Sequence, residues 1–143
     1  MKAMRVHAYG DRLDEPMVLD EIPEPRPGPG ELLIKVKAVG VNPVDLSIRR
    51  GLANYVSHLE LPHLLGSEIS GEVVDWGENV SGFDRDEKVF GYDGQREAYA
   101  EYVVLKADFV SRLPDGVSFS DGAALSVAFQ TAWHALVIQA KAG

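Results

Sequence analysis

The sequence predicts a mainly β domain in which short strands form a barrel and one apolar helix follows them. Between residues 5 and 112, short runs of strand-forming residues alternate with turns rich in glycine and proline. This spacing is typical of a barrel rather than of βαβ units. The 14 glycines and 8 prolines among 143 residues agree with a loop-rich β domain. A chain of this length suits a single core.

The strands themselves are expected to be short. They are predicted at residues 5–9, 17–22, 31–41, 67–76, 88–91, 97–105 and 108–112. The third is the clearest, because Leu33 and Lys35 face one way and Leu32 and Ile34 the other, as in a half-buried strand. The stretch before it, PEPRPGPGE, predicts an extended connector, because proline cannot donate to a β-ladder. Within the fourth strand, Gly71 lacks a side chain where another backbone is expected to pass close.

A short helix is expected directly after the third strand. Pro43 suits the first turn of a helix over PVDLSIRRG, and Gly51 closes it. Residues 52–65 show no clear period, so an irregular loop is expected there.

A second helical region follows residue 117. Ser118 and Asp121 resemble a capping box that starts a small helix through Leu125. From Ser126 onward a longer helix is predicted whose surface is apolar nearly all round. Such a helix is expected to be covered on all sides. We therefore expect this chain, taken alone, to lack the surface that would cover the helix.

Composition and charge exclude several classes of protein. The net charge is −8, and the densest basic spot is Arg49–Arg50, so a nucleic-acid binder is not expected. There is no cysteine, which excludes disulfides, a thiolate nucleophile and zinc sites with sulfur ligands. The longest apolar stretch, 125–140, is interrupted by polar residues and is shorter than the ~20 residues of a membrane span. We therefore expect a cytoplasmic protein that binds neither nucleic acid nor membrane.

Five stretches in order resemble one family. They are PGPGE (27–31), KAVGVNPVDLSIRRG (37–51), GSEISGEVVDWGENV (66–80), AYAEYVVLKADFVSR (98–112) and LPDGVSFSDGAAL with the later QTAWHAL. Together they are similar to the zinc-free, quinone-reductase-like branch of the medium-chain dehydrogenase/reductase superfamily. The resemblance implies a GroES-like, partly open β-barrel with a few short helices and a C-terminal interdomain helix. It also implies a left-handed backbone at Asp86, where relatives have glycine.

The resemblance implies a division of the chain at residue 125. Residues 1–125 would form the GroES-like substrate and catalytic domain, and residues 126–143 a helix that leads toward a nucleotide-binding domain. In full-length members a Rossmann domain follows, but this chain contains no G-x-G-x-x-G sequence. We therefore expect the Rossmann domain to be absent from this chain, and the 143-residue fragment alone to be inactive.

The resemblance also bears on zinc. Zinc-dependent members have Cys and His where this chain has Asn42 and Ser67, and neither residue is a useful zinc ligand. A second group, His58, Glu60 and His63, comes close in sequence, and ordinary loop packing is favoured there over a metal site. We therefore expect no zinc and no metal ligands.

Zinc-free relatives transfer hydride from NADPH to a quinone or an α,β-unsaturated carbonyl. Asn42 matches the family position that faces the nicotinamide, where its amide would hold a substrate carbonyl or part of the cofactor; the alternative is a turn residue bonded to the following backbone. Asp45 is a second catalytic candidate, although a structural role in fixing the short helix is favoured. Thr131 matches a cofactor-binding position, or else bonds back within its helix. Gln130 beside it is a weaker cofactor-binding candidate.

Three residues are candidates for lining the substrate site. They are Ser47, Tyr55 and Tyr92, and the two tyrosines are equally interpretable as packing residues at the end of the barrel. The predicted partners are a small-molecule substrate and further copies of the same chain in a homo-oligomer. The alternative to a reductase is a non-catalytic GroES-like binding module, which the presence or absence of a dinucleotide-binding sequence downstream would decide.

Overall fold

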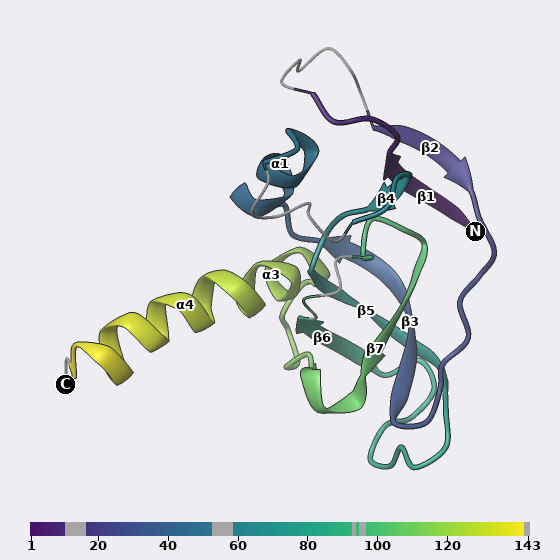
Figure 1. Ribbon diagram of the computed structural model, residues 1–143. Helices are drawn as coiled ribbons and strands as arrows, with labels where there is room; N and C mark the ends of the chain where they lie inside the picture. Colours follow the sequence, from purple (N-terminus) through teal and green to yellow (C-terminus); the bar gives the residue numbers. More distant parts are fainter. Residues whose placement is uncertain (11–16, 53–58, 93, 95–96, 142–143) are drawn as a thin grey trace.

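The protein is mainly β, as predicted, and its strands form two antiparallel sheets that do not close into a barrel (Figure 1). The structure is a computed structural model that describes residues 1–10, 17–52, 59–92, 94 and 97–141. Within that part of the chain a helix projects from the β body, and the C-terminus lies at its far end.

The larger sheet carries the main core. Its strands, in spatial order, are β7 (Tyr102–Lys106), β3 (Glu31–Val39), β5 (Glu68–Trp76), β6 (Lys88–Tyr92) and β8 (Val110–Arg112). Leu32 and Ile34 of β3 are fully buried against Ile69 and Val73 of β5. The ladder between β3 and β5 shifts register after Leu33 and again after Val36. Such irregularities bend and twist a strand, which helps a sheet to curl.

The smaller sheet contains a strand that the sequence pattern did not predict. Its order is β2 (Val18–Glu21), β1 (Lys2–Val6) and β4 (His63–Leu64). Strand β4 lies within the stretch 52–65 where an irregular loop was expected, so that prediction was wrong at residues 63 and 64. A strand of two residues is too short to show an alternating pattern. It is defined only by its pairing with Arg5 and Val6.

Several predicted strands begin or end at other residues. The first runs over Lys2–Val6 rather than 5–9. The strand expected at 108–112 is confined to Val110–Arg112, because Ala107–Phe109 form a 3-10 turn. The strand expected at 97–105 is confined to Tyr102–Lys106. Before it, Ala98 and Tyr99 donate their backbone N–H groups to the carbonyls of Gly66 and Leu65, outside the named ladders. These residues are hydrogen-bonded to another segment, but Tyr99 lies in a bend and neither residue belongs to β7, so the predicted strand began too early.

Backbone geometry confirms two of the predictions about single residues. A Cβ atom at Gly71 would overlap the backbone oxygen of Lys35, so the close backbone approach is real. Asp86 has a φ angle of 65°, which is the left-handed conformation expected there.

The C-terminal helical run extends from Phe119 to Gln139, and its residues from 128 onward are exposed. Ser118 caps it, and its oxygen accepts a bond from the Asp121 N–H, as the capping box predicted. Helix α3 (Phe119–Ala124) passes into a π-helical segment η2 (Leu125–Phe129), then α4 (Gln130–Trp133) and a second π-helical segment η3 (His134–Gln139). The two helices expected on either side of residues 125 and 126 are thus one continuous helical run, whose hydrogen-bond pattern changes at Leu125. No helix within the described residues is long and apolar enough to cross a membrane.

Candidate functional site

The site is built where β3 ends and the short helix α1 (Pro43–Arg49) begins. Asn42 is the N-cap of α1 and has extended backbone angles. Its backbone N–H donates to Oδ2 of Asp45 at 2.8 Å, and the Asp45 N–H donates to the Asn42 carbonyl at 3.0 Å. These two bonds satisfy the first turn of α1, with Pro43 at its first position as expected.

Asp45 faces the interior and joins α1 to two other segments. Its side chain is 3% exposed. In addition to the Asn42 N–H, it accepts the Gly66 N–H at 3.2 Å and the Tyr99 hydroxyl at 3.1 Å. A buried carboxylate needs hydrogen-bond donors, and these three bonds supply them. The geometry gives Asp45 a role in holding α1 against the strands.

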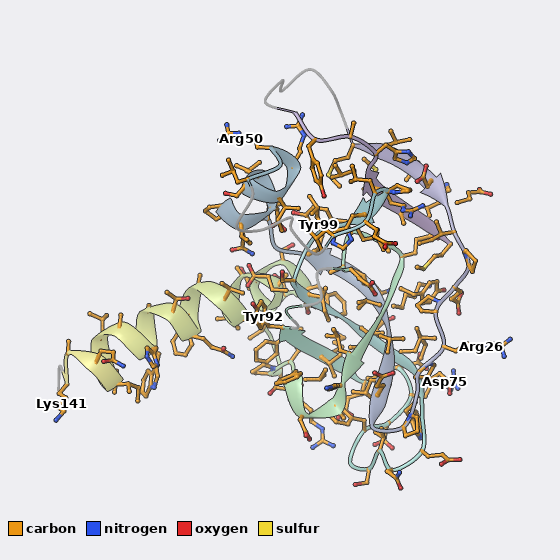
Figure 2. All side chains as sticks on the ribbon, viewed as in Figure 1. Arg26, Arg50, Asp75, Tyr92, Tyr99 and Lys141 are labelled. Carbon is orange, nitrogen blue, oxygen red and sulfur yellow. The ribbon has the colours of Figure 1, made fainter. Side chains whose placement is uncertain are left out.

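Tyr99 is affected by the same charge. It lies between α1 and the sheets (Figure 2). Burial raises the pKa of Tyr99 above its ordinary value, and the negative charges of Asp45 and Glu68 raise the pKa further. Its hydroxyl therefore stays a hydrogen-bond donor throughout the neutral range.

Glu68, the first residue of β5, connects Asn42 to the C-terminal helix. Its side chain is 4% exposed. Oε1 accepts a bond from Nδ2 of Asn42 at 2.8 Å, and Oε2 accepts one from the backbone N–H of Val127 at 2.7 Å. Gly40, at the end of β3, makes room for it, because a Cβ atom there would overlap the Glu68 side chain.

A hollow lies between the end of β3 and the start of the helix. Its wall contains Asn42 and Glu68 together with small side chains on both elements. Its lining residues are Ala38, Val39, Gly40, Val41, Asn42, Glu68, Ser120, Ala123, Ala124 and Ala128. A concave surface with few polar groups fixed in place suits part of a small organic molecule.

Among the cofactor candidates, Gln130 and Thr131 lie on exposed turns of the helix, beyond η2. They are close along the chain to Val127, the residue that Glu68 holds. Beside them Phe129 and Trp133 stack with ring centroids 6.0 Å apart. More than half of each of these two side chains is exposed.

The substrate candidates are separated. Ser47 lies on α1, where its hydroxyl donates to the Pro43 carbonyl at 3.1 Å. Tyr92, the last residue of β6, is exposed near the base of the projecting helix (Figure 2). Tyr55 lies outside the described residues, as does His58 of the proposed histidine group. The structure thus brings Asn42, Asp45 and Glu68 together, and it places Ser47 and Tyr92 on different elements.

The donors at the zinc-equivalent positions do not fit zinc. Ser67 is buried, and the Asn42 amide nitrogen is already bonded to Glu68. Zinc sites in proteins use thiolate, imidazole and carboxylate ligands, usually three or four together. Within the described part of the chain, no group of three or more His, Asp or Glu residues is arranged to hold a metal ion.

Sequence reasoning missed two residues of this site, Glu68 as a partner of Asn42 and Tyr99 as a partner of Asp45. Both pairs join residues that lie far apart along the chain, so no local pattern identifies the partner. One signal was present: Glu68 directly precedes Ile69 in a strand that the sequence predicted, and a carboxylate that is buried there must find hydrogen-bond donors.

The family comparison agrees with the sequence resemblance. The profile of the alcohol dehydrogenase GroES-like domain matches residues 28–115. Quinone oxidoreductase from Mus musculus is 37% identical over 145 residues, which cover 99% of this chain and 42% of that protein. Quinone oxidoreductase from Homo sapiens is 37% identical over 148 residues, which cover 100% of this chain and 43% of that protein. The chain thus spans less than half the length of these relatives.

Solved structures give the same result. The quinone oxidoreductase from Coxiella burnetii has a TM-score of 0.88 at 33% identity, over 99% of this chain and 45% of that one. The Escherichia coli quinone oxidoreductase complexed with NADPH has a TM-score of 0.85 at 27% identity, over 95% of this chain and 40% of that one.

Proposed function

The chain belongs to the quinone-oxidoreductase-like branch of the medium-chain dehydrogenase/reductase superfamily, and from this we propose that it is the substrate-binding part of an NADPH-dependent reductase. The reaction would be the reduction of a quinone or an α,β-unsaturated carbonyl. NADPH, held mainly by a further domain, would supply the hydride. The protein would supply placement of the two reactants and exclusion of water.

The observation that carries this proposal is the fixed amide of Asn42 at the rim of the hollow. Its nitrogen is bound to a buried carboxylate, so the side chain is held in one orientation. A side chain held in this way orients a bound group without first losing conformational freedom. We assign Asn42 to holding the nicotinamide part of the cofactor or the substrate carbonyl. Thr131 and Gln130, on the same helix as Val127, would reach the cofactor from the other side.

The remaining candidates have supporting roles in this proposal. Asp45 would keep Asn42 and α1 in place through its bonds to the Asn42 N–H and to Tyr99. Ser47 and Tyr92 would contact the substrate, together with Tyr55. We propose that the reaction uses no zinc, because Asn42 and Ser67 occupy the positions of the metal ligands and their donor groups are unsuited to zinc.

Residues 1–125 would form the substrate domain, and residues 126–143 would connect it to the nucleotide-binding domain. The exposed apolar side chains of the helix support this assignment. Single apolar residues scattered over a surface need no explanation, but this helix exposes several large ones together, including Phe129, Trp133, Leu136 and Ile138. Burial of this surface against a further domain would explain them.

The test is a steady-state assay of the full-length protein. NADPH oxidation is followed at 340 nm with 1,4-benzoquinone or an alkyl enone as acceptor, with protein treated with a chelator. We expect acceptor-dependent NADPH oxidation that the chelator does not change. Saturable binding of the quinone without any NADPH oxidation would instead support a non-catalytic GroES-like binding module. Activity that is lost with the chelator and regained with zinc would contradict the zinc-free mechanism.

A further inference from the structure

We propose that Glu68 is a positioning residue that holds Asn42 and the C-terminal helix in a fixed relation to each other. This inference rests on the proposed function, since its catalytic consequence acts through Asn42. The evidence is that each oxygen of the Glu68 carboxylate accepts one hydrogen bond. Oε1 accepts from Nδ2 of Asn42 at 2.8 Å, and Oε2 accepts from the Val127 N–H at 2.7 Å.

The two bonded elements carry different parts of the proposed site. Asn42 stands between β3 and α1, and Val127 lies in η2, directly before the helical turn with Gln130 and Thr131. A shift of the Glu68 carboxylate would therefore change the distance between the groups that contact the cofactor from two sides. Displacements of about 1 Å in such groups cost on the order of a hundredfold in rate.

The local backbone is built to offer this bond. In η2 the helix is widened to the π-helical pattern, and the Val127 N–H is directed to Glu68. Single π-helical turns occur frequently at functional sites. On the opposite side, Gly40 leaves the space that the Glu68 side chain occupies. Both features fit the carboxylate into one position.

The chemistry of the carboxylate distinguishes positioning from simple packing. A carboxylate offers two acceptors to two N–H donors, whereas a glutamine of the same shape offers one oxygen and one amide nitrogen. In Glu68→Gln the glutamine nitrogen would face either the Val127 N–H, which can only donate, or Asn42, whose amide would then have to turn over and exchange its donor for its acceptor. If Asn42 is replaced by alanine, a single donor remains, and the glutamine oxygen satisfies it.

This difference gives a double-mutant cycle in the full-length enzyme. We expect Glu68→Gln to lower kcat by roughly tenfold to a hundredfold, which is the loss expected for one hydrogen bond to a charged group. In the Asn42→Ala background the same change should cost less than about threefold. We expect the KM for the quinone to change less than kcat. The matched control is Glu72→Gln on the same strand, where Glu72 pairs with Lys37 at 3.0 Å.

An equal fold-loss from Glu68→Gln in both backgrounds would overturn the proposal, because Glu68 would then act independently of Asn42. If Glu68→Gln folds only when combined with Asn42→Ala, as judged by circular dichroism, the unpaired donor is the cause and the proposal is supported. If it folds in neither background, the fold needs the carboxylate itself and the proposal is overturned.

A second measurement keeps this inference separate from the proposed function. If the wild-type protein oxidises no NADPH with quinones or enones, the proposed function fails. Nuclear magnetic resonance then tests only the two hydrogen bonds that Glu68 accepts from Asn42 and Val127. We expect Glu68→Gln to move the side-chain NH₂ signals of Asn42 or the backbone amide signal of Val127, while Glu72→Gln leaves them in place. Unchanged signals in Glu68→Gln would show that Glu68 does not hold Asn42 and Val127, and would overturn the proposal.

Discussion

The hydroxyl of Tyr99 donates a hydrogen bond to Oδ2 of Asp45 over 3.1 Å, between residues that are 54 positions apart in the chain. The same Asp45 oxygen accepts the backbone N–H of Asn42. One carboxylate therefore connects the segment before β7 to the start of α1. The orientation of Asn42 depends on this connection as well as on Glu68.

Removal of the Tyr99 hydroxyl is expected to destabilise the fold. In Tyr99→Phe the buried carboxylate of Asp45 loses one of its donors, at a cost of about 1–2 kcal/mol in the free energy of unfolding. Chemical denaturation of both proteins at pH 7 measures the difference. Tyr102→Phe on β7 is a suitable control, since no hydrogen bond of its side chain is among the contacts that hold the site. An effect as large in the control would contradict the assignment.

The stabilisation by Tyr99 should depend on pH in one direction. Burial first, and then the charges of Asp45 and Glu68, raise the pKa of Tyr99 in the folded state, while the unfolded value is about 10. The stabilisation is thus fully present below about pH 10 and is lost as the pH rises through the folded-state pKa. The difference in unfolding free energy between wild type and Tyr99→Phe should shrink above pH 10. A difference that grows with pH would contradict this.

Asn42 and Asp45 should differ in their effect on catalysis. In the full-length enzyme we expect Asn42→Ala to lower kcat/KM by roughly tenfold to a hundredfold, the equivalent of ~1–3 kcal/mol of transition-state stabilisation. Asp45→Asn should mainly lower stability, because its new amide nitrogen would face either the Gly66 N–H or the Asn42 N–H. Both are assayed at a temperature where each variant is fully folded. Equal or reversed effects on kcat/KM would identify Asp45 as the catalytic residue.

The exposed helix is expected to make residues 1–143 self-associate in isolation. Its side chains Phe129, Trp133, Leu136 and Ile138 are each more than half exposed. Their burial against a second copy would gain ~25 cal/mol per Å², minus the cost of association. Sedimentation at several concentrations should show concentration-dependent dimers or larger species, and Trp133→Glu should shift them toward monomer. Gln130→Glu on the same helix is the control. A monomer at all concentrations with a fully helical C-terminus would contradict the prediction.

The full-length protein is expected to hold no tightly bound zinc, because Asn42 and Ser67 stand in place of thiolate and imidazole ligands. Metal analysis of protein purified without a histidine tag measures this directly. A control variant with Asn42→Cys and Ser67→His reports whether the site can accept zinc once suitable ligands are present. One zinc per wild-type chain would contradict the expectation.

The sequence by itself determined the class of fold, the main strands and the family. Strand β3 was predictable because Ile34 and Val36 alternate with Lys35 and Lys37, and so was the cap at Ser118. The family followed from stretches such as KAVGVNPVDLSIRRG, in which Asn42 and Asp45 lie close together. Burial periodicity, caps and turns all depend on neighbouring residues, and these leave a local pattern.

The tertiary structure alone decided which residues meet. Strand β4 is defined by its partner in β1, and two residues are too few to show a period. The bonds from Glu68 to Asn42 and Val127, and from Tyr99 to Asp45, join segments that are distant in sequence. The sequence indicates that a carboxylate, if it is buried, needs hydrogen-bond donors. Which donors it finds is settled by the way the strands and the helix pack, because hydrogen bonds of this kind depend on positions within about 3 Å in space.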